Sequence, residues 1–176
     1  MRSTTDSRLE QEYSDFFRAH LSAVRGYVCT LVVESEVDVV VSATFVTAWQ
    51  KFRAVPLLSG RAWLFGVARH HVYNQIRSDR RRAVMVDALT DLRPETTVGM
   101  FGADADPTEV GEVLAALADL TNDEREIIQL TVWHELQPTE IAEVLRIAPN
   151  TARVRLHRAR KHLVAVLAAA RGEDAS

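Results

Sequence analysis

The side chains of this chain best suited to chemistry are cations gathered toward its C-terminal end. Between Arg146 and Lys161 the sequence holds six arginines and lysines and no acid, although the whole chain of 176 residues has a formal charge of −3. Guanidinium and ammonium groups bind phosphate, and arginine can also donate two hydrogen bonds to the O6 and N7 atoms of guanine. The cluster therefore indicates contact with a polyanion, and nucleic acid fits it best.

The cations belong to a pattern of two short helices joined by a turn. Pro138 and Pro149 each suit the first position of a helix. The backbone N–H at that position makes no hydrogen bond within the helix, so its absence in proline has no cost. The three residues 146–148 are expected to form the turn. The expected apolar faces are Ile141, Ala142 and Leu145 on the first helix, and Ala152, Leu156, Ala159 and Leu163 on the second. This arrangement predicts a helix-turn-helix whose second helix lies in the DNA major groove.

The face opposite that second apolar stripe is expected to read DNA. Arg153 and Arg158 can reach guanine, Val154 can pack on a thymine methyl group, and His157 projects beside them. Arg155, Arg160 and Lys161 are expected to contact phosphates, and first-turn amides of the helix add donors.

Charge is divided into three zones along the chain. Residues 1–82 carry a slight positive excess that is concentrated in the run Arg77–Arg82. Residues 87–126 hold eleven acids against two arginines, and residues 146–162 are purely basic apart from two histidines. Two basic zones around an acidic middle predict contact with a polyanion at two separate places.

Apolar periodicity predicts an all-α chain made of two small domains. Steps of three and four residues indicate helices over 8–33, over 37–53 and after Ser59, which is a candidate N-cap. Residues 84–107 lack such periodicity and predict a flexible acidic linker between domains at 8–83 and 108–170. Thr121 and Glu124 fit a capping box that opens a helix running to about Glu135.

Other kinds of chemistry find little support. The six histidines lack metal-ligand spacing, since His134 has no second histidine of an H-E-x-x-H pattern and His70 and His71 point about 100° apart on a helix. The single cysteine, Cys29, cannot form an internal disulfide and is expected to be a small buried apolar residue. No catalytic residue, metal or cofactor is predicted. No signal peptide or membrane segment is apparent, so a cytoplasmic setting is expected.

Several segments together resemble the bacterial sigma factors of the extracytoplasmic-function type. The stretch "LTNDEREIIQLTVWHELQPTEIAEVLRIAPNTARVRLHRARKHL" is similar to region four of that family, and "ATFVTAWQKF" followed by "RAWLFGVARHHVYNQIRSDRRR" looks like region two. The two parts stand in the order that the family shows, and the resemblance covers nearly the whole chain.

The resemblance implies a non-catalytic protein that binds RNA polymerase core, through its β and β′ subunits, and promoter DNA, with an anti-sigma factor as a further partner. Region four would read the −35 element through Asn150, Thr151, Arg153, Val154, Arg155, His157, Arg158, Arg160 and Lys161. Region two would face the melted −10 strand with Arg53, Arg61, Trp63, Arg69, His70, Tyr73, Asn74, Arg77, Arg80, Arg81 and Arg82. Polymerase would be bound by Glu36, Asp38, Thr44, Phe45 and Trp49.

Some positions depart from the family pattern. Val39, Ser42 and Ala43 stand where acidic and amide residues are common, which predicts an altered polymerase contact. Arg146 replaces the usual turn glycine, and Ala148 stands where a serine or threonine cap is common.

Two other functions remain open from the sequence. An ordinary helix-turn-helix regulator that acts without polymerase core exchange would share the pattern at 138–163, but it would not need the basic end of the third helix. A pure protein-binding module, such as an inactive sigma factor held by an anti-sigma factor, would support no transcription.

Overall fold

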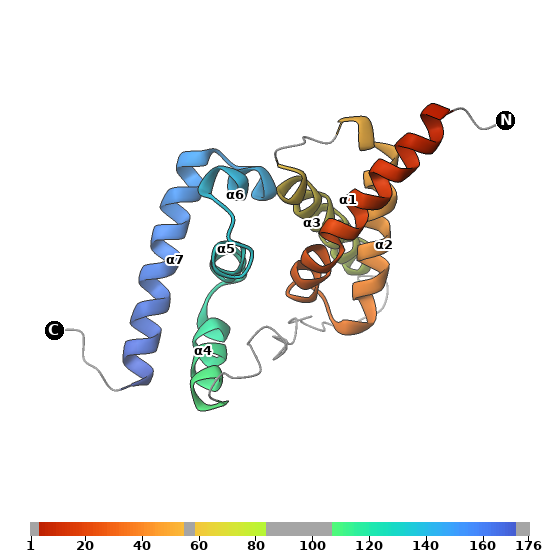
Figure 1. Ribbon diagram of the computed structural model, residues 1–176. Coiled ribbons are helices and arrows are strands. Elements are labelled where there is room, and N and C mark those ends of the chain that lie inside the picture. Colours follow the sequence, from red (N-terminus) through yellow and green to blue (C-terminus); the bar gives the residue numbers. More distant parts are fainter. Residues whose placement is uncertain (1–3, 55–58, 84–106, 172–176) are drawn as a thin grey trace. The chain divides into compact units, whose positions relative to one another are not determined.

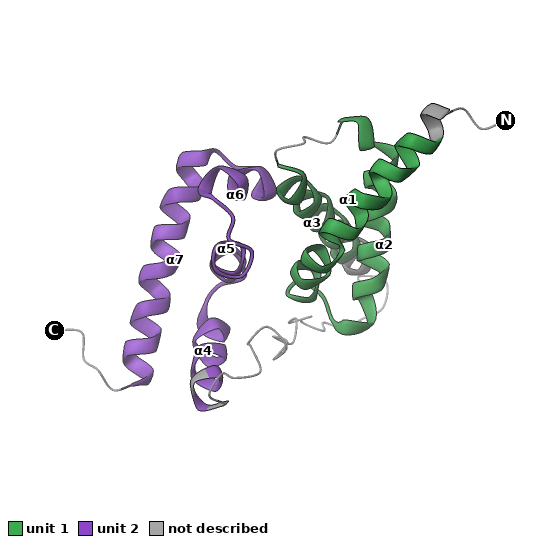
Figure 2. Cartoon of the chain, in the orientation of Figure 1, with its two compact units in different colours: residues 1–95 green, residues 96–176 purple. Residues whose placement is uncertain are grey.

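The structure is a computed structural model that describes residues 4–54, 59–83 and 107–171. Within these ranges every regular element is helical, as predicted (Figure 1). The chain divides into two compact units, residues 1–95 and 96–176 (Figure 2). The elements are α1 (Thr4–Cys29), α2 (Glu34–Gln50), the short 3-10 helix η1 (Phe52–Ala54), α3 (Gly60–Ala83), α4 (Pro107–Asp119), α5 (Asn122–Val132), α6 (Pro138–Leu145) and α7 (Pro149–Ala170).

In the first unit α1, α2 and α3 pack against one another in all three pairs. Tyr27 of α1 stacks on Phe65 of α3 with ring centroids 4.6 Å apart, and both rings are buried. The Tyr13 hydroxyl donates to the Phe45 carbonyl oxygen at 2.5 Å and so ties α1 to α2. Aliphatic side chains from all three helices make up much of the rest of this core, among them Val24, Val28, Val37, Val40, Leu64, Ala68 and Val72.

The second unit is built around α7, which packs against α4, α5 and α6. Its buried apolar side chains are Ala116, Leu117, Leu120, Ile127, Ile128, Leu130, Leu136, Ile141, Ala142, Val144, Ala152, Leu156 and Ala159. The predicted stripe of α7 is confirmed at its first three positions, whereas Leu163 is only half-buried. On α6 Ile141 and Ala142 are buried as predicted, but Val144 is buried in place of Leu145, which is half-buried.

Arg125 is a buried cation that holds α4 against α5. Its Nε donates to the Leu117 carbonyl oxygen at 2.7 Å, and its Nη2 donates to the carbonyl oxygens of Ala118 at 3.2 Å and Leu120 at 3.0 Å. These acceptors are the carbonyls that a helix leaves without partners at its C-terminal end. The Arg125 guanidinium therefore caps the C-terminal end of α4. No local sequence pattern predicts this role.

The predicted capping box at the start of α5 is confirmed. The Thr121 hydroxyl accepts from the Glu124 amide at 3.3 Å, and the Glu124 carboxylate accepts from the Thr121 amide at 3.0 Å. The predicted end of this helix, at about Glu135, was wrong by three residues, since α5 ends at Val132. Glu135 lies in the left-handed region, with φ 51°, and cannot continue the helix. That residue turns the chain so that Leu136 enters the core and donates its amide to the Leu130 carbonyl oxygen at 3.1 Å.

The expected helix ends in the first unit also shift toward the N-terminus. The first helix spans Thr4–Cys29 and the second Glu34–Gln50, in place of 8–33 and 37–53. Thr30 helps to end α1, because its amide and its hydroxyl both donate to the Tyr27 carbonyl oxygen, at 3.1 and 2.7 Å. The predicted linker at 84–107 lies outside the described residues, except for Pro107 at the start of α4.

Candidate nucleic-acid interface

The pair α6 and α7 forms the predicted helix-turn-helix. Pro138 and Pro149 occupy the first turns of their helices. A second capping box, missed in the sequence, starts α6: the Gln137 amide donates to the Glu140 carboxylate at 2.8 Å. Only half of the usual signal was present, since a glutamate stands three residues later but Gln137 is not one of the common cap residues. The two helix starts are thus determined locally.

The turn between the two helices contains a strained arginine. The Ile147 amide donates to the Ala142 carbonyl oxygen at 3.0 Å, and the Arg146 amide donates to that of Glu143 at 3.3 Å. This pattern is a Schellman motif, which requires a left-handed residue, and Arg146 has φ 55° and ψ 48°. Ala148 precedes α7 with no side-chain cap, as its type predicted.

The outward face of α7 carries the side chains that the sequence assigned to it. The exposed members are Asn150, Thr151, Arg153, Val154, Arg155, His157, Arg158, Arg160 and Lys161. Val154 is 42% exposed on this face. Guanidinium groups flanking one apolar side chain can contact both a guanine edge and a thymine methyl group.

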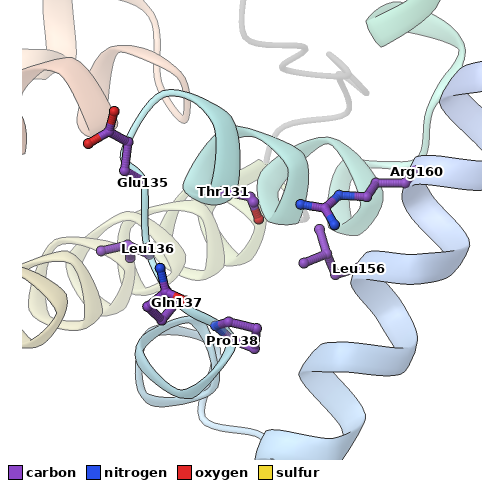
Figure 3. A pocket seen from close by; sticks show the side chains of 7 residues that line it. All are labelled: Thr131, Glu135, Leu136, Gln137, Pro138, Leu156 and Arg160. Atoms are coloured by element: carbon purple, nitrogen blue, oxygen red, sulfur yellow. The ribbon is translucent and has the colours of Figure 1, made fainter.

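Two cations of this face have contacts within the second unit. Arg155 forms an ion pair with Asp123 of α5, with 3.5 Å between Nη1 and Oδ2. Arg160 extends from α7 toward Thr131 of α5 and lines a hollow of about 410 Å³ (Figure 3). The other lining residues are Glu135, Leu136, Gln137, Pro138 and Leu156. Of the predicted phosphate contacts, Lys161 has no such contact among the described residues.

His162 continues this face toward the start of α5. Its Nδ1 lies 3.2 Å from both carboxylate oxygens of Glu124. The pKa of Glu124 is lowered, mainly by the hydrogen bond from the Thr121 hydroxyl and further by that from the Thr121 amide and by His162. A residue of the capping box therefore also links α5 to α7.

The second basic region lies on α3, on the side away from the core. His70, Tyr73, Asn74 and Arg77 are exposed, and Arg61, Trp63 and Arg69 are half-buried. Their spacing of three, four and seven residues places them on neighbouring stripes of one helix. Arg53 is exposed on η1. The backbone of Arg80, Arg81 and Arg82 continues α3, but their side chains lie outside the described residues.

Contacts within α3 preorganise part of this surface. The guanidinium carbon of Arg69 lies 4.4 Å from the centroid of the Tyr73 ring, which is a cation–π geometry. The Asn74 amide nitrogen lies 2.9 Å from Nε2 of His70. An aromatic ring held by a cation next to amide and imidazole groups provides stacking and hydrogen bonding for an unpaired base.

The predicted polymerase contact on α2 is only partly at the surface. Thr44 is buried, with its hydroxyl donating to the Val40 carbonyl oxygen at 2.7 Å, and Phe45 is buried against Phe17 at 4.6 Å between centroids. Both were predicted to contact polymerase, and both are instead core residues. Because α2 is apolar on more than one side, its packing against α1 and α3 determines which of its residues are buried.

The acids of α2 are held by neighbouring helices. Asp38 forms an ion pair with Arg25 of α1, which also pairs with Glu34 at 3.2 Å. This arrangement raises the pKa of Arg25, chiefly through its hydrogen bond to Asp38. Glu36 accepts from the Gln75 side-chain amide of α3 at 3.0 Å.

An exposed apolar stripe runs along α2, and of its members only Trp49 was among the predicted polymerase contacts. Val39 is 62% exposed, Val46 is 57% exposed and Trp49 is 42% exposed. Trp49 was among the predicted polymerase contacts, and its ring also makes an edge contact with Tyr13 of α1, at 4.9 Å between centroids. Three large apolar side chains exposed on one helix indicate a protein contact.

The described residues offer no other reactive centre. No group of three or more histidine, cysteine, aspartate or glutamate side chains in these ranges is placed to hold a metal ion. Cys29 is half-buried, which raises the pKa of its thiol. Among the helices described, none has both the length and the apolar character needed to cross a membrane.

Comparisons with known proteins agree with this geometry. The family model "Sigma-70, region 4" matches residues 111–163, which include α6, the turn and α7 as far as residue 163. The ECF RNA polymerase sigma factor SigL of Mycobacterium tuberculosis is 30% identical over 147 residues, covering 78% of each chain. The chain belongs to the extracytoplasmic-function sigma factors. It therefore directs promoter recognition by RNA polymerase and is not an enzyme.

Two solved structures share the fold of this sigma factor. The sigma factor RpoE from Bartonella quintana, crystallised with the anti-sigma factor NepR, has a TM-score of 0.72 at 24% identity and covers 89% of this chain and 97% of its own. The structure of CnrH in complex with the cytosolic domain of CnrY has a TM-score of 0.62 at 25% identity, with 91% and 90% covered. Family membership decides against a helix-turn-helix regulator that acts without polymerase core exchange.

Proposed function

We propose that this sigma factor recognises promoters through two separate surfaces, one on α7 and one on α3, and holds polymerase core through α2. The domains assigned to these tasks are 8–83 for region two and 108–170 for region four, with the acidic segment 84–107 between them. The observation that carries the proposal is the outward face of α7, where exposed arginines surround one exposed valine.

The α7 surface reads the −35 element. Arg153, Val154, His157 and Arg158 contact base edges, because they follow one another along the exposed stripe of the recognition helix. Arg155, Arg160 and Lys161 contact phosphates, with Asn150 and Thr151 at the helix start. Since Arg155 is paired with Asp123, Arg160 and Lys161 are the members whose charges have no ion-pair partner among the described residues.

The α3 surface binds the melted −10 strand. Trp63, Tyr73 and His70 offer rings for stacking, and Asn74 and Arg69 offer polar groups next to them. Arg53, Arg61, Arg77 and the run Arg80–Arg82 contribute the positive charge that a nucleic-acid backbone requires. Opening a duplex costs a few kcal/mol for each unstacked step, which this surface offsets.

The α2 surface binds polymerase core by a contact that is more apolar than acidic. Val39, Val46 and Trp49 supply exposed apolar area. Glu36 and Asp38 stand at the rim, where each already has a partner within the unit. Thr44 and Phe45 act indirectly, since their burial orients the helix that bears the stripe.

Two further features follow from the same proposal. An anti-sigma factor is a partner of this chain, as NepR is of the structurally similar RpoE. The protein acts in the cytoplasm, where RNA polymerase works.

Run-off transcription tests the proposal. Purified polymerase core, this protein and fragmented genomic DNA should give discrete transcripts whose start sites share −10 and −35 motifs. The protein without core should bind the same duplexes weakly, because its net charge is negative and its basic surfaces lie on separate units. Failure to bind core, or tight sequence-specific binding by the protein alone, would contradict it.

A further inference from the structure

We propose that Arg146, in the turn between α6 and α7, is an additional DNA contact that binds a backbone phosphate beside the −35 element. The inference rests on the proposed function of α7 and extends its surface to the preceding turn. In the sequence Arg146 is the first of the six cations of the basic cluster, and it stands where a turn glycine is usual.

The backbone conformation of Arg146 does not favour arginine. The residue has φ 55° and ψ 48°, in the left-handed region that the Schellman motif at the end of α6 requires. Glycine adopts that region without a steric cost, asparagine tolerates it, and a long side chain is disfavoured there. A strained residue in an exposed turn is a reason to look for a function of its side chain.

Packing does not account for the side chain. The Arg146 side chain is exposed, and within the described residues its guanidinium group has no hydrogen bond, ion pair or aromatic contact. The contrast with Arg125 is direct, because the buried guanidinium of Arg125 donates to three carbonyl oxygens. Arg146 therefore carries a charge that the second unit does not use.

The position of Arg146 favours phosphate over a base edge. In a helix-turn-helix complex the second helix enters the major groove, while the first helix crosses the backbone beside it. Arg146 follows the last residue of the first helix and precedes Pro149 by three residues. No acid stands between Arg146 and Lys161 to compete for it. A guanidinium there can donate two parallel hydrogen bonds to a phosphate.

The test measures how DNA affinity depends on salt for the full-length protein. The probe is a 30-base-pair duplex of mixed sequence, roughly three helical turns, which reports phosphate contacts without knowledge of the promoter. Arg146→Gly should lower the slope of log affinity against log salt by about 0.9. The affinity ratio of wild type to variant should then shrink about fourfold between about 20 and 100 mM salt. Arg146→Lys keeps the charge and should retain the wild-type slope.

A second measurement separates this role from a purely structural one. Arg146→Gly should unfold at a temperature equal to or above that of the wild type, because glycine relieves the left-handed strain. Reduced DNA affinity in a protein that is no less stable assigns the loss to the missing charge. An unchanged salt slope in Arg146→Gly would overturn the inference.

Lys161→Ala is the reference that distinguishes failure of the inference from failure of the proposed function. If Lys161→Ala lowers the slope and Arg146→Gly does not, the α7 surface binds DNA without Arg146. If neither variant changes the slope, the DNA-binding role of α7 itself is contradicted. If Arg146→Gly weakens assembly with polymerase core while its DNA slope is unchanged, Arg146 contacts protein and the inference is wrong.

Discussion

Arg155 of α7 and Asp123 of α5 form an ion pair, with 3.5 Å between the guanidinium nitrogen Nη1 and the carboxylate oxygen Oδ2. Both side chains are largely exposed, so the pair adds little to the stability of the second unit. Its importance lies in function, because a carboxylate that holds a phosphate-binding arginine competes with DNA.

Asp123→Asn should strengthen binding to duplex DNA. The change removes the competing charge and leaves Arg155 in place. The expected gain in affinity is about 1.5- to 5-fold, which corresponds to the range of about 0.2–1 kcal/mol for exposed ion pairs. Fluorescence anisotropy on a labelled duplex measures it. Adding Arg155→Ala to the same chain should cancel most of the gain, and a gain that persists would show that Asp123 acts by general repulsion.

Arg158→Ala and Arg153→Ala should each reduce discrimination at the −35 element by about 1–3 kcal/mol. Both side chains are exposed on the recognition face of α7, so the variants should fold normally. The measurement compares transcription from a native promoter with transcription from promoters that carry single base changes in the −35 element. Initiation equal to wild type from all of these templates would contradict the assignment of that arginine as a base reader.

Trp49→Ala should weaken binding to polymerase core at least tenfold, because buried tryptophans are frequent hot spots at interfaces, worth about 2 kcal/mol or more. Val46→Lys should act in the same direction, since it places a charge in the apolar stripe of α2. Ala19→Lys, at an exposed position of α1 in the same unit, is the matched control. Binding is measured by titrating labelled core. Equal affinities for all three variants would remove α2 from the interface.

The stability of the first unit should fall as the pH is lowered below about 6.5, the ordinary pKa of histidine. Burial, and secondarily His70, lowers the pKa of His71, whose Nε2 lies 2.9 Å from the Thr47 hydroxyl. The pKa of His20 is lowered by burial and by Arg61. Because these histidines have lower pKa values in the folded chain, the unfolded chain binds protons more tightly. Stability therefore falls as the pH drops through about 6.5 and levels off below the lowered folded-state pKa values. His71→Gln should flatten this dependence in urea titrations between pH 8 and 5, and His70→Gln should flatten it less.

Local signals in the sequence were sufficient for the helix-turn-helix. A proline at the start of each helix, a threonine and glutamate three residues apart, and the spacing of small apolar residues on α7 act within one or two helical turns. These interactions do not depend on distant parts of the chain. The structure therefore reproduces the starts of α5, α6 and α7 and the exposed face of α7 as predicted.

Tertiary packing decided the rest. Helix α2 is apolar on more than one side, so its own periodicity could not determine that Phe45 is buried while Val46 and Trp49 are exposed; the positions of α1 and α3 determine it. The same holds for the charges, because Asp38 and Arg155 find partners on other helices that only folding brings near. The amino-acid sequence by itself determined the helices and the family, since both depend on residues close along the chain. The three-dimensional fold decided which cations and apolar side chains remain available to a partner, because burial and ion pairing depend on residues far apart in sequence.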